Sequence, residues 1–131
     1  MDEVTIARPE LQAHDWAMRT SFADVVKRVE ELLTSRLVAY LAGVQETRAV
    51  HEWAGGQREV RSASVEARLR LAGQVAVFLA DGETPRVVQA WFQGLNPYLD
   101  DRSPARLLRE GELEEVGPEV IAAARAFALR G

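Results

Sequence analysis

Apolar residues recur at the spacing of an α-helix along most of the chain, and no stretch shows the alternation that is typical of a strand. The clearest apolar stripe runs from Phe22 to Leu33, and Ser21 is placed to cap its first turn. Further stripes predict helices near 35–42, 46–54, 65–80, 85–93, 104–110 and 118–129. The pattern therefore predicts an all-α fold of about seven helices.

Turn-forming residues separate these stripes. Glycine that follows an apolar stripe can end a helix, and a capping residue before proline favours a helix start. The predicted ends are Gly43, Gly55-Gly56, Asp81-Gly82, Gly94 and Gly111, and the predicted starts include Ser62 or Ser64, Thr84-Pro85, Ser103-Pro104 and Pro118. Residues 1–20 have only weak periodicity and are predicted to form an N-terminal arm. The chain is thereby divided into this arm, a middle region at 21–82 and a C-terminal region at 83–131.

Composition places the chain among ordinary globular proteins. It has 131 residues, of which 47% are hydrophobic and 27% charged. The absence of cysteine excludes disulfides and thiolate metal sites and fits a reducing compartment. We predict a cytoplasmic protein, because the N-terminus lacks the apolar core of a signal peptide and no apolar run is long enough to span a membrane.

The charge is spread unevenly. The net charge is −4, but the middle region at 21–82 balances eight basic against eight acidic residues. Between Arg36 and Arg70 there are six arginines and four glutamates, which is a mild positive bias. This bias is weaker than the basic stripe of a strong solitary nucleic-acid binder, so DNA binding would rely on a homodimer that doubles the phosphate contacts.

Residues 34–56 have the spacing of a helix–turn–helix, with two short helices joined at Gly43. The residues expected to lock the two helices together are Leu37, Val38, Leu41, Val50 and Trp53. The outward residues expected to meet base edges or phosphates are Gln45, Thr47, Arg48 and His51, with Arg58, Arg61 and Arg68 placed for the DNA backbone. The alternative is a plain helical hairpin in which Arg48 is a solvated charge, and Glu46 and Glu52 would repel phosphate.

No pattern in the chain predicts catalysis, a cofactor or a metal. His14 and His51 lack a plausible set of further ligands, and no glycine-rich phosphate loop is present. The adjacent acids at 100–101 and 114–115 are explained more simply by a turn and a solvated helix face than by acid–base chemistry. We therefore expect a protein that is not an enzyme.

A family resemblance is carried mainly by the second half of the chain. Its features are Trp91-Phe92, Asn96-Pro97, Leu99, Ser103-Pro104, Leu107-Leu108 and Gly111, followed by a last helix. In the first half the matching features are the turn at Gly43 and the ending Trp53-Ala54-Gly55-Gly56. With these residues the chain resembles the Xre/MbcA/ParS-type antitoxins over about residues 33–131.

The resemblance implies an antitoxin of a type II toxin–antitoxin system. The helix–turn–helix would bind the operator of its own operon, and residues 83–131 would form a small helical toxin-binding domain. Its partner would be a RES-domain toxin, an NAD-consuming enzyme, whose active-site entrance the C-terminal helices would cover. Carried onto this chain, the expected toxin-binding residues are Ser103, Arg106, Arg109, Arg125, Phe127 and Arg130.

Two other interpretations are compatible with the same residues. The chain could be a stand-alone helix–turn–helix transcriptional regulator whose C-terminal part is a dimerisation domain. It could also be a pure interaction module whose helix–turn–helix no longer contacts DNA. For each arginine of the C-terminal region, the simpler alternative is a solvated side chain.

Overall fold

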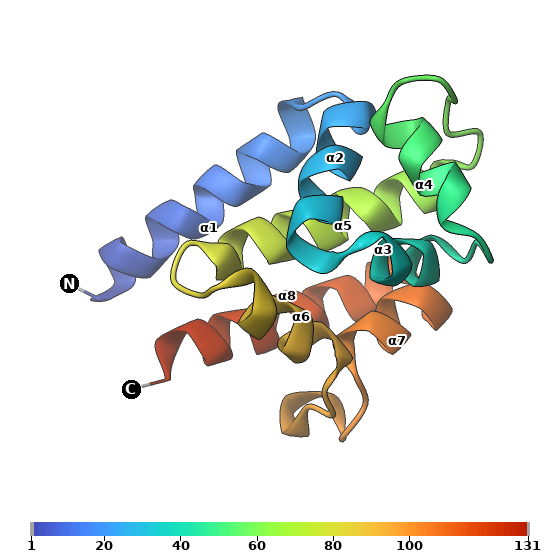
Figure 1. Cartoon of the computed structure of the whole chain (residues 1–131). Helices are drawn as coiled ribbons and strands as arrows, with labels where there is room; N and C mark the ends of the chain where they lie inside the picture. Colours follow the sequence, from blue (N-terminus) through green and yellow to red (C-terminus); the bar gives the residue numbers. More distant parts are fainter. Residues whose placement is uncertain (1, 131) are drawn as a thin grey trace.

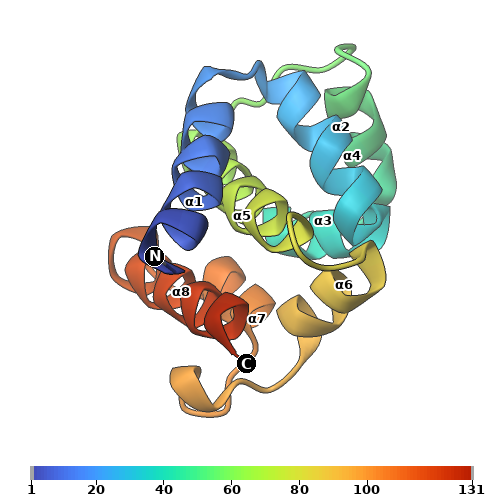
Figure 2. The same ribbon diagram turned by 90° about the vertical axis from the view of Figure 1, so that its left-hand side faces the viewer.

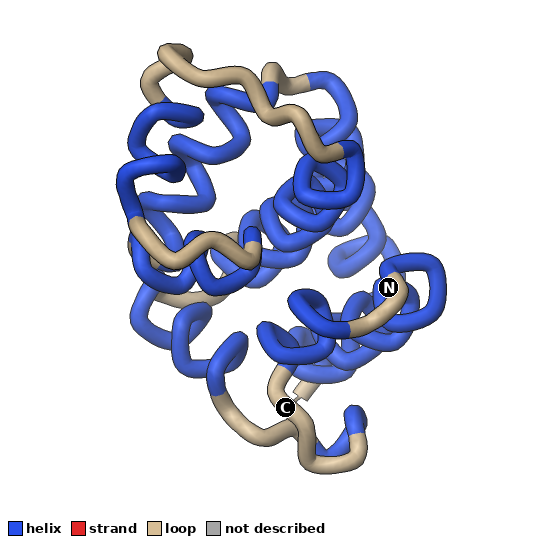
Figure 3. The backbone as a smooth tube through the Cα atoms, turned by 90° about the vertical axis from the view of Figure 1, so that its right-hand side faces the viewer, coloured by secondary structure: helices blue, strands red, loops and turns tan. Residues whose placement is uncertain are grey.

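The computed structural model describes residues 2–130, and these residues form helices without any strand (Figures 1 and 3). The elements are α1 (Asp2–Arg19), α2 (Phe22–Leu33), α3 (Ser35–Ala42), α4 (Thr47–Ala54), α5 (Ala63–Ala80), α6 (Pro85–Gln93), the short 3-10 helix η1 (Pro97–Leu99), α7 (Pro104–Glu110) and α8 (Leu113–Leu129). The predicted all-α fold is confirmed for the described part of the chain. None of the helices in that part is long and apolar enough to cross a membrane.

Helix α5 lies at the centre of the fold. It contacts α1, α2, α3, α6, α7 and α8, and Figure 2 shows it between α1 on one side and α2 and α4 on the other. Its buried residues lie in the second and larger part of the helix, from Leu69 to Leu79. A helix that is apolar on most sides is stable only when it is surrounded by other elements, which explains its central position.

A single cluster of buried residues extends from Ala13 on α1 to Ala124 on α8. It includes Val38 on α3, Val50 on α4 and Phe92 on α6, each fully buried. The segments predicted as arm, middle region and C-terminal region therefore share one hydrophobic core.

The sequence analysis missed α1 as a helix. Its buried residues include Ala13 and Ala17, and such small residues give a weak apolar stripe even where packing is tight. Close packing is made possible by Gly73 on α5, where a β-carbon would lie 3.0 Å from a methyl group of Val29 and 3.2 Å from the ring of Trp16. Pro9 also lies inside α1, and proline inside a helix argues against helix in a sequence-based reading.

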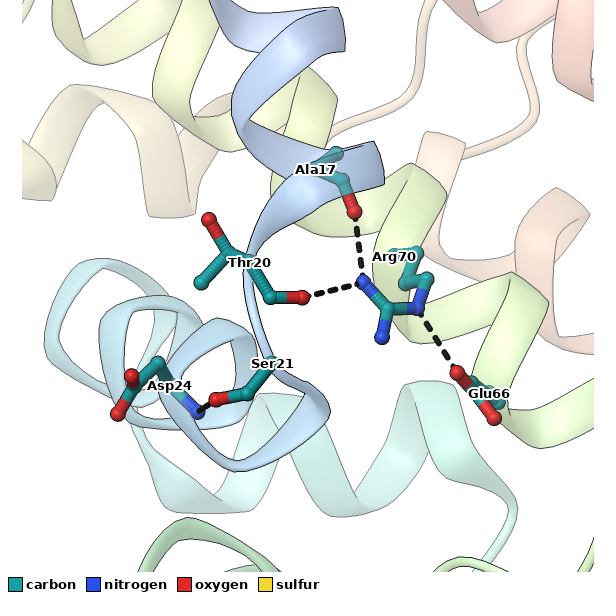
Figure 4. Close-up of polar contacts among 6 residues, drawn as sticks. All are labelled: Ala17, Thr20, Ser21, Asp24, Glu66 and Arg70. Atoms are coloured by element: carbon teal, nitrogen blue, oxygen red, sulfur yellow. Dashed lines mark hydrogen bonds and ion pairs between the residues drawn. The ribbon is translucent and has the colours of Figure 1, made fainter.

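Arg70 fixes the end of α1 to α5 (Figure 4). Its Nη1 donates hydrogen bonds to the carbonyl oxygens of Ala17 at 2.7 Å and Thr20 at 2.8 Å. Its Nε donates to Glu66 at 2.9 Å, one turn earlier on α5. Carbonyl groups at the end of a helix have no partner within the helix, so the guanidinium satisfies them and joins the two elements.

The predicted start of the last helix was also wrong. We expected the helix to begin at Pro118, but α8 begins at Leu113 and includes both Gly117 and Pro118. Val116 and Gly117 are buried, and a β-carbon at Gly117 would lie 3.0 Å from Leu71 on α5. Packing of this first part of α8 against the core therefore outweighs the backbone hydrogen bond that Pro118 cannot donate.

Several predicted helix boundaries are confirmed. The side chains of Ser21, Ser62, Thr84 and Ser103 each accept a hydrogen bond from a backbone N–H in the first turn of α2, α5, α6 and α7. Gly43 ends α3 in the left-handed conformation with φ 78°.

Thr34 joins α2 to α3 in an unusual backbone conformation. Its φ is 80° and its ψ is 154°, a region that residues other than glycine rarely adopt. Its N–H donates to Glu30 O at 3.0 Å at the end of α2, and its side chain accepts from Leu37 N at 3.4 Å at the start of α3. One residue thus ends one helix and caps the next.

Candidate functional site

Helices α3 and α4 pack against each other across a turn at residues 43–46. The five residues predicted to lock them together, which include Leu41 and Trp53, are all buried. Arg68 on α5 donates to the carbonyl oxygen of Leu41 at 3.1 Å, which holds the end of α3 just before the turn. Arg68 is half-buried in this role, which gives it a structural function, and its contact with the DNA backbone stays a prediction.

Four of the predicted DNA-binding residues lie on one surface, which we call the α4 face: Gln45, Thr47, Arg48 and His51. Gln45, Thr47 and Arg48 line one groove, and Thr47, Arg48 and His51 line a second depression beside it. The α4 face is therefore continuous and solvent-exposed, apart from the half-buried Thr47.

Arg58 and Arg61 lie beside the α4 face and do not belong to it. They line a separate pocket of about 520 Å³, together with the edge of Trp53 and residues of the loop between α4 and α5. The sequence placed them near the DNA backbone, and the structure places both on an exposed loop next to α4.

Acidic side chains contact two arginines and the histidine of this region. Glu52 lies 3.5 Å from Arg48 and 2.8 Å from Arg58, and Glu30 Oε2 lies 2.7 Å from Nδ1 of His51. An ion pair at an exposed surface stabilises a protein by at most about 1 kcal/mol, so a phosphate group can replace a glutamate as the partner of an arginine. They nevertheless reduce the positive field that a phosphate backbone would meet.

The six predicted toxin-binding residues do not gather in one place. Arg109 on α7 stacks on Tyr40 of α3, whereas Arg125 on α8 forms a bidentate pair with Glu10 of α1 at 2.8 and 3.0 Å. The hydrogen bond and the charge of Glu10 raise the pKa of the Arg125 guanidinium above its ordinary value. An arginine is protonated in proteins near neutral pH, and this contact with Glu10 strengthens that preference for Arg125.

The other four lie along α7 and at the end of α8. Ser103 caps α7, and Arg106 pairs with Glu110 at 3.1 Å on the exposed side of the same helix. Phe127 packs against Trp91 with ring centroids 6.5 Å apart, and the guanidinium of Arg130 lies 3.6 Å from the centroid of the Phe127 ring.

The sequence analysis missed the most exposed apolar residues of the C-terminal region. Leu95 is 76% exposed and Tyr98 is 74% exposed, and both line a groove of about 350 Å³ with Pro97 and Phe127. We call these four residues the apolar surface. Most of it belongs to the segment between α6 and α7, drawn in light orange, which extends away from the helical body (Figures 1 and 2).

The segment that carries the apolar surface is held in shape by its own hydrogen bonds. Asn96 Oδ1 accepts from the N–H of Tyr98 at 2.9 Å, and Asn96 N donates to the carbonyl oxygen of Arg102 at 3.1 Å. Buried Leu99 anchors the segment to the core. Leu95 and Tyr98 are thus displayed by an ordered turn, and a surface that is ordered before binding loses less entropy when a partner binds.

A signal for this surface was present in the sequence. Leu95 and Tyr98 flank Asn96-Pro97, and neither belongs to the apolar stripe of an α-helix. The packing of an amphipathic helix on the core therefore does not bury them. Large apolar residues that stand outside the periodic pattern, in a turn-rich segment, are candidates for contact with another molecule.

Among residues 8–130, whose side chains the structure describes, no group of three or more histidine or acidic residues is arranged to hold a metal ion. In comparisons with known proteins, no protein-family model, no curated protein and no solved structure matches the chain.

Proposed function

We propose that the protein is an antitoxin that neutralises a RES-domain, NAD-consuming toxin by covering the entrance to its active site. The proposal also includes repression of its own operon through α3, the turn and α4. It needs no catalytic group in the antitoxin, since exclusion of substrate requires only a complementary surface.

The observation that carries the proposal is the apolar surface. It lies within the segment whose residues resemble the antitoxin family, and its two most exposed members are a tyrosine and a leucine. Burying one large side chain of this kind stabilises a complex by roughly 1.5 to 3 kcal/mol. A rigid turn that presents such residues next to a groove is well suited to enter a partner's cleft.

The repressor role is supported by the position of the α4 face. Thr47 and Arg48 are the first two residues of α4, Gln45 lies in the preceding turn and His51 in the last turn of the helix. The N-terminal residues of a recognition helix are those that contact base edges in the major groove. The pairing of Arg48 and His51 with glutamates favours the alternative in which the helix pair only supports the fold. Sequence-specific DNA binding is therefore the weaker half of the proposal.

Co-expression with a RES-domain protein encoded beside this chain tests the inhibitory role. The expected result is a stable complex in which NAD consumption by the toxin is lost. Leu95→Asp is expected to separate the two proteins and restore NAD loss. Met18→Asp is the matched control, because Met18 is an apolar residue of α1 that is 65% exposed and far from the apolar surface in sequence.

The same preparations distinguish the proposal from a stand-alone regulator. Such a regulator would form a homodimer through its C-terminal part, and Leu95→Asp would convert that dimer to a monomer in light scattering. A dimer that depends on Leu95, together with no complex and no protection of NAD, would contradict the antitoxin proposal.

A further inference from the structure

We infer that a groove between α3, α4 and α7 binds phosphate through Arg36, Arg48 and Arg109, and that the phosphate belongs to the DNA backbone beside the α4 face. This inference rests on the proposed DNA-binding role. It adds Arg36, which the sequence analysis did not select, and reassigns Arg109, which we expected to contact a toxin. We call these three arginines and Tyr40 the basic groove.

The three arginines come from three different helices and line one groove of about 690 Å³. Arg36 is the second residue of α3, Arg48 is the second residue of α4, and Arg109 lies in the last turn of α7. Each is exposed, and Glu46 is the only acidic residue that lines the groove. The groove is therefore positive although the whole chain is negative.

Two of the three arginines form no ion pair with the carboxylates that the structure describes. Among residues 8–130, no carboxylate oxygen lies within 4.0 Å of a side-chain nitrogen of Arg36 or Arg109. Arg48 is 3.5 Å from Glu52, but its side chain is 79% exposed, so this pair is weak. The groove thus differs from the rest of the α4 region, where Arg58 and His51 contact glutamates.

Arg109 is held in place for binding. Its guanidinium lies 4.5 Å from the centroid of the Tyr40 ring, and its Nη1 donates to the carbonyl oxygen of Tyr40 at 3.2 Å. A guanidinium has five N–H donors, so most of them are still available to a ligand. Because stacking and the hydrogen bond already restrict the side chain, binding costs less conformational entropy.

The start of α4 adds to the positive potential. Glu46 occupies the capping position of α4, but its side chain accepts no hydrogen bond from the helix. The first N–H groups of α4 therefore have no partner from a capping side chain, and Thr47 and Arg48 at this end both line the groove.

The arrangement fits phosphate better than a carboxylate. One planar guanidinium can engage a carboxylate by itself, whereas donors that converge from three helices suit the tetrahedral oxygens of a phosphate. Thr47 and Arg48 also line the second depression of the α4 face, which contains Glu52 as well, so the phosphate site adjoins the base-reading surface through these two residues. Contacts to phosphate set the position of a protein on the duplex, and contacts to base edges read the sequence, so the two surfaces need to be neighbours.

The test compares Arg36→Ala and Arg109→Ala with Arg106→Ala. Arg106 lies on the same helix as Arg109, but it pairs with Glu110 and does not line the groove. Fluorescence anisotropy would measure binding to two DNA duplexes over a series of salt concentrations. One has the sequence upstream of the gene that encodes this chain, and the other has the same bases in scrambled order. A second arm would follow the Nε–H signals of the arginines by NMR during titration with inorganic pyrophosphate.

We expect Arg36→Ala and Arg109→Ala each to weaken binding to both duplexes by about fivefold or more. Each should lower the slope of log affinity against log salt by about 1, as expected for the loss of one phosphate contact. Arg106→Ala should change neither quantity. Arg109→Lys should keep part of the salt slope and lose affinity, because lysine retains the charge but not the planar stacked group.

The possible results separate this inference from the proposed function. If Arg109→Ala behaves like Arg106→Ala while Arg48→Ala still weakens binding, DNA binding stands and the phosphate site is overturned. If Arg109→Ala leaves DNA binding unchanged but abolishes copurification with the RES-domain protein, Arg109 serves the protein partner and the inference is overturned.

Wild-type protein that binds neither duplex would contradict the DNA-binding role itself. In that case the NMR titration with pyrophosphate tests whether the basic groove binds phosphate at all. Saturable shifts of the Arg36 and Arg109 signals would support the phosphate site with a free phosphate compound as its source. Unchanged signals would overturn it.

Discussion

The α4 face and the apolar surface are both exposed, but they differ in how their side chains are satisfied. On the α4 face, Arg48 and His51 already have glutamate partners from the same chain. On the apolar surface, Leu95 and Tyr98 remain in solvent at 76% and 74% exposure, and the core does not cover them. Charged groups of the first face thus have partners within the chain, whereas the large apolar groups of the second are exposed to water.

This difference separates two sources of binding free energy. Charged groups that exchange one partner for another contribute mainly to orientation, association rate and salt dependence. Apolar groups that leave water contribute most of the affinity. We therefore expect the protein partner to bind tightly through the apolar surface, and DNA to bind weakly and with strong dependence on salt.

The largest effect should be a loss of stability when a buried side chain near the apolar surface is truncated. Phe92 is fully buried and packs edge-to-face on Trp91 with centroids 5.2 Å apart. Phe92→Ala is expected to lower the free energy of unfolding by about 3 to 5 kcal/mol, measured by urea denaturation. Tyr98→Ala should change it by less than about 0.5 kcal/mol. An equal loss for Tyr98→Ala would mean that the turn belongs to the core and is not a docking element.

The next effect concerns the partner. Tyr98→Ala is expected to weaken the complex with the RES-domain protein by about 2 kcal/mol, or roughly 30-fold in Kd, because exposed tyrosines that become buried are common binding hot spots. Isothermal titration calorimetry would measure it. Tyr98→Phe keeps the ring and should retain most of the affinity. A wild-type Kd for the alanine variant would remove Tyr98 from the interface.

On the α4 face, Arg48→Ala should weaken or broaden operator recognition by roughly 1 to 3 kcal/mol, since a bidentate contact to guanine would be lost. A gel-shift series with single base changes in the upstream duplex would show it. Arg86→Ala, at an exposed position of α6, is a control for the loss of one positive charge. Unchanged binding by the Arg48 variant would remove its role as a base-reading residue.

The smallest effect should be a gain. Glu52 pairs with both Arg48 and Arg58, so Glu52→Gln would release two guanidinium groups. We expect affinity for a scrambled duplex to rise by roughly threefold at low salt, which corresponds to a surface ion pair of less than about 1 kcal/mol. The gain should shrink as salt is added, because the charges are screened. Fluorescence anisotropy at two salt concentrations would detect it.

Local signals predicted much of the fold. Caps such as Ser21 and Ser103, and the left-handed Gly43, act within one turn of helix, so the sequence alone contains the information. Helix α1 was missed because its packing depends on Gly73, which lies far away on α5. The early start of α8 was missed for a similar reason, since burial of Val116 against the core outweighs the signal of Pro118.

The candidate site was less predictable than the fold. Burial of the residues that join α3 to α4 follows from helical periodicity, and this prediction is confirmed. Arg109 and Tyr40 are 69 residues apart, and only the packing of α7 on α3 brings them together. The distribution of the predicted toxin-binding residues over several contacts likewise depends on tertiary structure. Periodicity identifies which side of a helix faces inward but not which helices are neighbours.

Thr34 has a consequence for the direction in which the α4 face points. A β-branched residue held at φ 80° costs roughly 1 to 3 kcal/mol, so the surrounding packing must hold the bend between α2 and α3 against that cost. Threonine has few alternative conformations at positive φ, whereas glycine at this position would have many. Thr34 therefore narrows the range of angles that the α3–α4 pair can adopt relative to α2. The orientation of the α4 face is thus restricted before any ligand binds.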